Sequence, residues 1–335
     1  MKHYPSRYPR SGQKAILCEG DLAGYEVDML ESWTAAFPDV GLVDVWPCGT
    51  KTAIFGMADA IGRAIPVFVI EDRDHRSHDV AEKDCRRSKK DRTGRSVKIG
   101  GWTTWNRSEI ENYLVEPVVL VPTFSEVFDT TEEEVSQRLQ EILKDTACDQ
   151  SLQFALSEFR ATFPNGEKEV GGVSRQDGRP RWGEHGLILP KPEKVATLLR
   201  EVLLAANARL APERQPNPEK FVERFDQRLE KWKSMKIEDE EWRIDWAGKE
   251  ILGWLRIRMS AEFGWPEGKN PDSRIPIKWE SLTKSDYGEM DRRIEYTLQE
   301  RLVKRFLKSL RTTGVLPTTV CEEWMGIIGD LRTSV

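Results

Sequence analysis

The sequence contains few cysteines, and their spacing fits no familiar framework. Its 335 residues include five of them: Cys18, Cys48, Cys85, Cys148 and Cys321. An odd number of cysteines without a C-x-x-C pair predicts neither a set of disulfides nor a zinc ribbon. This usage is typical of proteins that stay in the reducing cytosol.

Long apolar runs are also missing. No stretch approaches the ~20 consecutive apolar residues that span a bilayer. Residues 1–14 carry charges and prolines where a signal peptide would have an apolar segment. We therefore expect a cytoplasmic protein without a membrane partner.

The sequence lacks an excess of positive charge. It has 51 Lys and Arg against 56 Asp and Glu, which gives a net charge of -5. A uniformly basic surface for nucleic acid is therefore excluded, and any such surface must be local. A hydrophobic content of 39%, with 12 Trp and 12 Phe, is enough to build a folded core. The length predicts about two domain-sized units, or one domain enlarged by an insertion.

Short apolar strands and amphipathic helices alternate at the start of the chain. Residues 14–18, 41–46 and 66–70 are candidate strands, and apolar residues recur at helical spacing between them. The run Pro66–Ile70 (PVFVI) is continuously apolar, as in a strand that is covered on both faces. The pattern predicts an α/β fold with a parallel sheet and right-handed crossovers.

A basic segment follows the third candidate strand. Residues 73–98 contain ten Lys or Arg against five acids and few large apolar side chains. We interpret residues 73–101 as a polar, locally basic loop. Its cations are candidates for gripping a phosphodiester backbone: Arg86, Arg87, Lys89, Lys90, Arg92 and Arg95.

Acidic residues stand where the first and third candidate strands end. Glu19 follows KAILC, and Asp72 and Asp74 follow PVFVI. The carboxyl ends of parallel strands meet at one edge of a sheet, so these side chains should converge. Converging carboxylates repel one another unless a divalent cation neutralises them, and hard oxygen ligands favour Mg²⁺ or Mn²⁺.

Four motifs in this order resemble those of a known family. The runs Ile16–Gly20 (ILCEG) and Val67–Asp74 (VFVIEDRD) resemble the glutamate and D-x-D motifs of a TOPRIM domain. Arg107–Leu114 (RSEIENYL) resembles a signature of the OLD-type branch of TOPRIM nucleases, and Ala247–Glu250 (AGKE) resembles the G-K-E that closes this domain. We expect residues 242–246 to form a short strand before that last motif.

The resemblance implies roles for individual residues. Glu19, Asp72, Asp74 and Glu111 would be metal ligands or acid–base groups, and Lys249 would hold the scissile phosphate. The family often has a further acid where this chain has Ala23, so either Asp21 or Glu26 substitutes for it or one of two metals binds weakly.

Two of these segments have simpler readings. Ser108 and Glu111 are spaced as a capping box, which would give Glu111 a purely structural role. The run Gly49–Thr52 (GTKT) lacks the first glycine of a Walker A motif, so it is either an ordinary strand-to-helix turn or a backbone-phosphate contact, and ATP hydrolysis is not expected.

In domain terms, the resemblance predicts a TOPRIM parallel-sheet core with an all-α insertion and C-terminal helices. Residues 1–120 would form the first part of the core, 121–238 the helical insertion, and 239–335 the end of the core with the C-terminal helices. Apolar periodicity predicts helices near 192–210, 218–234, 248–263, 290–312 and 319–332.

The whole chain most resembles the stand-alone TOPRIM effectors of PARIS anti-phage defence systems. This resemblance implies a Mg²⁺-dependent nuclease that cleaves tRNA, is restrained by an AAA/ABC-type ATPase encoded nearby and is released on infection, with a homodimer as a candidate active form. Two alternatives stay open: an OLD-type DNA endonuclease, and a non-catalytic subunit that binds nucleic acid or a partner through a decayed TOPRIM site.

Overall fold

The computed structural model describes most of the chain: residues 13–20, 24–73, 76, 78–93, 97–162, 181–183, 186–188, 190–208, 215, 217–266, 274–275 and 284–333. The chain divides into two compact units. One comprises Met1–Thr123 and Leu298–Val335, and the other comprises Phe124–Thr297. Residues 239–297 therefore group with the helical segment, and only 298–335 return to the sheet.

The first unit is built on a four-stranded parallel sheet. Its strands are β1 (Lys14–Cys18), β2 (Val43–Pro47), β3 (Val67–Glu71) and β4 (Ile99–Thr104), in the order β2-β1-β3-β4. This confirms the predicted α/β class and parallel sheet. The central strand β3 is buried along its whole length, as its continuous apolar run predicts.

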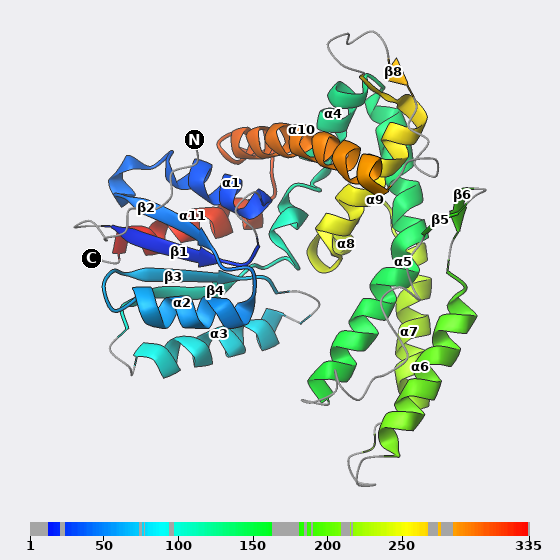
Figure 1. The fold of residues 1–335 in the computed structure, drawn as a ribbon, viewed down its shortest axis with the longest axis horizontal. Helices are drawn as coiled ribbons and strands as arrows, with labels where there is room; N and C mark the ends of the chain where they lie inside the picture. The colour runs from blue at the N-terminus through cyan, green and yellow to red at the C-terminus, as the bar shows by residue number, and fades with distance from the viewer. Residues whose placement is uncertain are drawn as a thin grey trace. The chain divides into compact units, whose positions relative to one another are not determined.

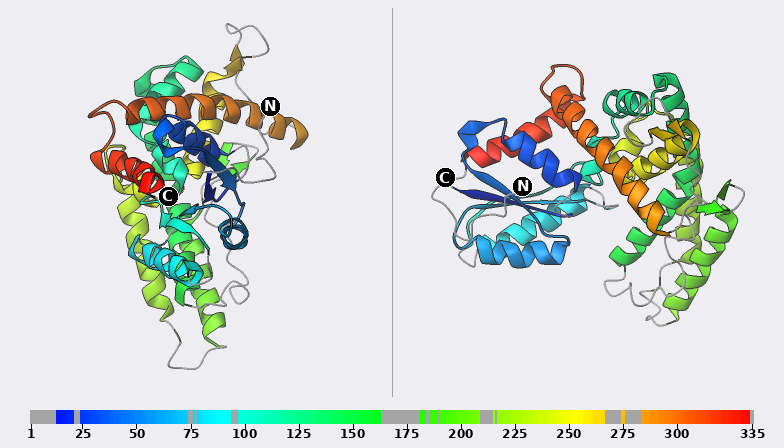
Figure 2. Two further views of the ribbon diagram at one scale, coloured as in Figure 1. Left: turned by 90° about the vertical axis from the view of Figure 1, so that its left-hand side faces the viewer. Right: turned by 45° about the horizontal axis from the view of Figure 1, so that its top comes forward.

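Helices cover both faces of this sheet (Figures 1 and 2). Helix α1 (Tyr25–Thr34) and helix α11 (Thr318–Thr333) lie on one face, and α2 (Lys51–Ile61) and α3 (His78–Thr93) lie on the other. Two 3₁₀ helices, η1 (Pro38–Val40) and η2 (Ile110–Tyr113), follow α1 and β4. The α2/α3 face carries an aliphatic core to which β1 and β3 contribute Leu17, Val67 and Val69.

The prediction of a basic loop over residues 73–101 is wrong. Residues 78–93 form helix α3, and residues 99–104 form strand β4. Ala81 and Cys85 are buried one helical turn apart, and this narrow apolar stripe anchors α3 to the sheet. The remaining long, charged side chains are good helix formers, so few apolar residues are needed.

Aromatic residues from distant segments pack together on the α1/α11 face. The fully buried Trp324 of α11 is their common neighbour, with its ring centroid 5.3 Å from that of Trp105, 5.1 Å from that of Phe306 and 5.6 Å from that of Tyr113. The Trp33 indole N–H donates to the backbone oxygen of Trp324 over 3.0 Å. The C-terminal helix thereby contributes directly to the core of the sheet unit.

The second unit is mainly helical. Its elements are the end of α4 (Pro117–Phe128), α5 (Glu132–Thr162), the hairpin β5 (Arg181–Gly183) and β6 (Gly186–Ile188), α6 (Pro192–Asn207), α7 (Pro218–Lys233), α8 (Glu241–Asp245), α9 (Gly248–Phe263), the hairpin β7 (Trp265–Pro266) and β8 (Arg274–Ile275), and most of α10 (Lys284–Leu310). Helix α5 packs against α7 and α9, and α6 packs against α7. In the described part of the chain, no helix combines the length and the apolar character needed to cross a membrane.

The short strand expected over residues 242–246 is wrong, because this segment lies in helix α8 and its C-cap. Trp242 and Trp246 alternate with Ile244 as in a strand, but they are also spaced four residues apart. Both tryptophans are fully buried, whereas Ile244 is only half-buried. The i, i+4 spacing was therefore the structural signal.

Candidate active site

Strand register brings the first two predicted acids together. Cys18 of β1 pairs with Ile70 of β3, so the residues that follow these strands are neighbours. The Glu19 carboxylate accepts a hydrogen bond of 3.0 Å from the backbone N–H of Asp72. The chain leaves β1 for β2 on one side and returns to β3 on the other, so these residues lie at a topological switch point, where α/β sheets bind ligands.

Consecutive carboxylates at the end of β3 have different surroundings. Glu71 is buried and accepts a hydrogen bond of 2.5 Å from the Trp102 indole N–H on strand β4. Asp72 interacts instead with Glu26 of helix α1 and with Glu111. Alternation of side chains along an extended backbone explains the difference and assigns Asp72, rather than Glu71, to the candidate site.

Helix α1 supplies a further carboxylate, Glu26. This residue lies in the first turn of α1, is only 4% exposed and accepts a hydrogen bond of 3.4 Å from the Trp105 indole N–H. Burial raises the pKa of Glu26 well above its usual value, and the negative charge of Glu111 raises it further. The structure therefore brings Glu26, one of the two residues considered as substitutes at the Ala23 position, close to the predicted acids, whereas Asp21 and Ala23 lie outside the described residues.

The RSEIENYL segment is held by its arginine. Arg107 is buried, pairs with the buried carboxylate of Glu116, donates to the backbone oxygen of Asn112 over 2.7 Å and lies over the Tyr113 ring. These contacts fix η2 and with it the position of Glu111, whose charge acts on both Glu26 and Asp72. The arginine of the motif is thus a structural clamp.

The capping box predicted for Ser108 and Glu111 is wrong. Glu109 is the N-cap residue of η2, and its partner in the capping box is Asn112, whose side-chain oxygen accepts from the Glu109 backbone N–H over 3.1 Å. Glu111 is the second residue of η2 and has no part in this box. The role of Glu111 as a metal ligand stays a prediction.

The four acids Glu19, Glu26, Asp72 and Glu111 form what we call the acidic cluster. Burial raises the pKa of Asp72 well above its usual value, and the charges of Glu26 and Glu111 raise it further. The Asp72 Oδ1 atom is buried and has no hydrogen-bond partner. A buried carboxylate oxygen without a donor, next to other carboxylates, fits the charge and the donor type of a hard divalent cation.

The described residues show only part of a ligand set. Among them, no group of three or more His, Cys, Asp or Glu side chains is placed to hold a metal ion. Asp74, the second acid of the D-x-D motif, lies outside the described residues. The assignments of Glu19, Asp72, Asp74 and Glu111 as metal ligands stay predictions.

A lysine of the GTKT segment, Lys51, lies next to Glu19 of the acidic cluster. The Nζ atom of Lys51, the first residue of α2, is 3.7 Å from the Glu19 carboxylate. The GTKT segment also forms an ordinary helix start, because the Thr50 hydroxyl accepts from the Ala53 N–H over 3.2 Å. The spacing of GTKT predicts either an ordinary turn or a backbone-phosphate contact, and it does not by itself place Lys51 beside Glu19. Lys249 is the second residue of α9 in the other unit, and its role stays a prediction.

The predicted nucleic-acid contacts are only partly gathered on one surface. Arg86, Arg87 and Lys90 are exposed on α3 and, together with Lys83, follow i, i+3, i+4, i+7 spacing along one helix face. We call these four residues the α3 basic stripe. Lys89 is half-buried and donates to the backbone oxygen of Gly100, while Arg95 and the side chain of Arg92 lie outside the described residues.

The raised pKa values predict a pH effect on stability when divalent cations are absent. The folded protein holds protons on Glu26 and Asp72 that the unfolded chain releases near pH ~4. Their stabilising contribution is complete below that pH and is lost as the pH rises through the raised pKa values. Melting temperatures in EDTA should therefore fall for the wild type relative to Glu26→Gln as the pH increases.

Mg²⁺ provides the control for this measurement. Because a cation would neutralise the ionised carboxylates, its addition at neutral pH should recover the wild-type melting temperature more than that of Glu26→Gln. A wild-type protein that gains stability relative to the variant with rising pH in EDTA would contradict the explanation.

Comparison with known proteins adds no family assignment. No protein-family model matches the chain, and no curated protein matches its sequence. Fold and site therefore define the chain as an α/β protein with a four-stranded parallel sheet and an acidic cluster at the carboxyl ends of its strands.

Proposed function

We propose that this protein is a Mg²⁺-dependent nuclease of the TOPRIM type. The observation that carries the proposal is that carboxylates from three separate segments interact electrostatically at a topological switch point, where the buried Asp72 Oδ1 has no hydrogen-bond partner. Ionisation of these carboxylates is unfavourable without a ligand, because like charges repel one another at low solvent exposure. A bound cation at a catalytic site would neutralise them.

Each residue then has a defined task. Glu19, Asp72 and Glu111, with Asp74, would hold Mg²⁺ or Mn²⁺. The bound ion would supply a Lewis acid for phosphoryl transfer and a water of lowered pKa. Lys51, paired with Glu19, would place a mobile positive charge near a phosphate oxygen, and the resemblance assigns a similar task to Lys249. Burial raises the pKa of Glu26, so this carboxyl would accept or release a proton at a higher pH than an ordinary glutamate.

We further propose tRNA as the substrate and anti-phage defence as the setting. The motif resemblance to PARIS effectors supports both, and it implies an ATPase partner that restrains the nuclease until infection. The α3 basic stripe supports a polyanionic substrate, because its exposed cations can follow a phosphate backbone despite the net negative charge of the chain.

The direct test is a substrate panel. Purified protein with Mg²⁺ should cut tRNA, and both EDTA and Glu19→Ala should abolish the cleavage. Plasmid DNA and single-stranded DNA and RNA in the same panel define the substrate class. Cleavage of DNA with intact tRNA would replace the tRNA proposal by an OLD-type DNA endonuclease, and cleavage that persists in Glu19→Ala would overturn the site.

A second candidate function is a non-catalytic nucleic-acid or partner-binding subunit. The observations that favour it are Ala23 in the sequence and the incomplete ligand set among the described residues. It predicts retained nucleic-acid binding, no cleavage of any substrate in the panel and no heat of Mg²⁺ binding in calorimetry. The nuclease proposal predicts the opposite result for cleavage and for heat.

A further inference from the structure

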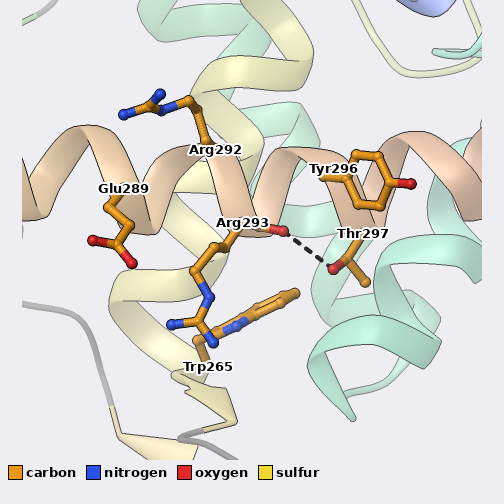
Figure 3. A pocket seen from close by; sticks show the side chains of 6 residues that line it. All are labelled: Trp265, Glu289, Arg292, Arg293, Tyr296 and Thr297. Atoms are coloured by element: carbon orange, nitrogen blue, oxygen red, sulfur yellow. Dashed lines mark hydrogen bonds between the residues drawn. The ribbon is translucent and has the colours of Figure 1, made fainter. Parts of the chain in front are cut away.

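The second unit contains a surface hollow whose lining residues are distant in sequence from the acidic cluster. It has a volume of about 720 Å³ and is lined by Trp265 of β7 and by five residues of α10: Glu289, Arg292, Arg293, Tyr296 and Thr297. Its size falls within the range of about 300–1,000 Å³ that is typical of small-molecule sites. Figure 3 shows Trp265 and Arg293 on the same side of α10.

The α10 lining residues form one continuous helix face. Positions 289, 292, 293, 296 and 297 follow i, i+3, i+4, i+7, i+8 spacing. Arg292 and Arg293 are exposed, and Tyr296 is 68% exposed although it is a large aromatic residue. At this exposure the Tyr296 ring is accessible to a ligand from solvent.

The opposite face of α10 anchors the helix. Arg256 of α9 is 8% exposed and pairs with Asp291 through two hydrogen bonds of 2.9 and 3.0 Å. It also lies 3.2 Å from Glu295. These ion pairs with α9 hold α10 from the side opposite the hollow.

The aromatic wall of the hollow is also fixed. Trp265 is half-buried, and its ring packs edge-on against the buried Phe128 with centroids 5.8 Å apart. The Thr297 hydroxyl donates to the backbone oxygen of Arg293 over 3.1 Å, so this side chain is held against its own helix. Aromatic rings beside guanidinium groups can stack bases and hold phosphates of a single strand.

We propose that this hollow binds a single-stranded stretch of nucleic acid. A base would stack on Tyr296 or Trp265, Arg292 and Arg293 would contact phosphates, and Glu289 would accept from a base amino group or a ribose hydroxyl. An acidic peptide would satisfy the arginines but would leave two aromatic rings without a flat partner. This inference rests on the proposed function, which supplies the class of ligand. It assigns the binding of a single strand to the hollow of the second unit rather than to the acidic cluster.

The test measures binding of a fluorescently labelled 12-nucleotide oligo-uridine by anisotropy in EDTA, so that cleavage does not interfere. Tyr296→Ala should weaken binding roughly 5- to 150-fold through loss of stacking, and Tyr296→Phe should retain near wild-type affinity. Arg293→Gln should reduce the slope of log affinity against log salt by about 0.7, the value for one phosphate contact on a single strand. Arg301→Gln, which removes an exposed arginine on the same helix but outside the hollow, is the matched control.

Three results would overturn the inference: wild type that fails to bind the strand, equal affinities of wild type and Tyr296→Ala, or an equal loss in Arg301→Gln. Displacement of the strand by oligo-glutamate with no effect of Tyr296→Ala would instead assign the hollow to an acidic peptide. Asp72→Asn should still bind the strand, because its substitution leaves the hollow intact. If the protein cleaves nucleic acid but the hollow variants bind the strand like the wild type, only this inference is wrong. If no nucleic acid is bound or cut, the proposed function is wrong as well.

Discussion

Asp72→Asn should abolish Mg²⁺-dependent cleavage while making the protein more resistant to heat in EDTA. The amide has the size of the carboxylate but removes one negative charge from the acidic cluster, where burial and the charges of Glu26 and Glu111 oppose ionisation. Loss of a charged group that acts at the reaction centre typically lowers the rate by about 100-fold or more. Cleavage assays and melting curves on the same preparation measure both effects.

Glu71→Gln is the matched control for this substitution. Glu71 precedes Asp72, but its carboxylate bonds to Trp102 through an oxygen that glutamine retains. We expect this variant to cleave at a rate close to that of the wild type. Equal losses of cleavage in the two variants, or a lower melting temperature of Asp72→Asn in EDTA, would contradict the assignment of Asp72 to a cation site.

Of the substitutions considered, Arg107→Ala should cause the largest decrease in the free energy of unfolding. It leaves the buried Glu116 carboxylate without its partner and removes the donor to the Asn112 oxygen and the cation over the Tyr113 ring. Removal of one member of a buried ion pair typically costs about 3–5 kcal/mol. The midpoint of urea unfolding, followed by circular dichroism, measures the change.

Two further variants separate the causes. Arg86→Ala breaks an exposed ion pair with Glu82 on α3 and should cost no more than about 1 kcal/mol. The double substitution Arg107→Met with Glu116→Leu removes both buried charges and should recover much of the lost stability. If Arg107→Ala and Arg86→Ala have the same urea midpoint, the contacts of Arg107 with η2 do not stabilise the protein.

Sequence reasoning succeeded where a local pattern has one structural outcome. Lys14–Cys18 was predicted as a strand with the bounds that the structure has, and the neighbouring apolar runs gave β2 and β3 within two residues at each end. It failed where one pattern fits two structures. The segment 242–246 satisfies both strand alternation and helical i, i+4 spacing, and only burial of both tryptophans decided for the helix.

The candidate site divides in the same way. The sequence predicted that Glu19 and Asp72 would lie close together, because the carboxyl ends of parallel strands share one edge of the sheet. The register of β1 against β3 then sets how close they are. The sequence left Glu26 as one of two substitutes for the Ala23 position and left GTKT, with Lys51, as a turn or a phosphate contact. It could not decide between these alternatives, since a helix carries charged residues on several sides and its rotation over the sheet decides which one faces the site.

By itself, then, the sequence determined the α/β class, the parallel sheet and the acids at its strand ends, because hydrophobic period and strand polarity are local properties. Only the tertiary structure decided that α3 is a helix, that Glu109 rather than Ser108 caps η2, that Arg107 is a buried clamp and that Glu26 joins the acidic cluster. Each of these depends on which side chain loses water against a distant segment, and burial of a charge or of an aromatic ring outweighs a short-range preference.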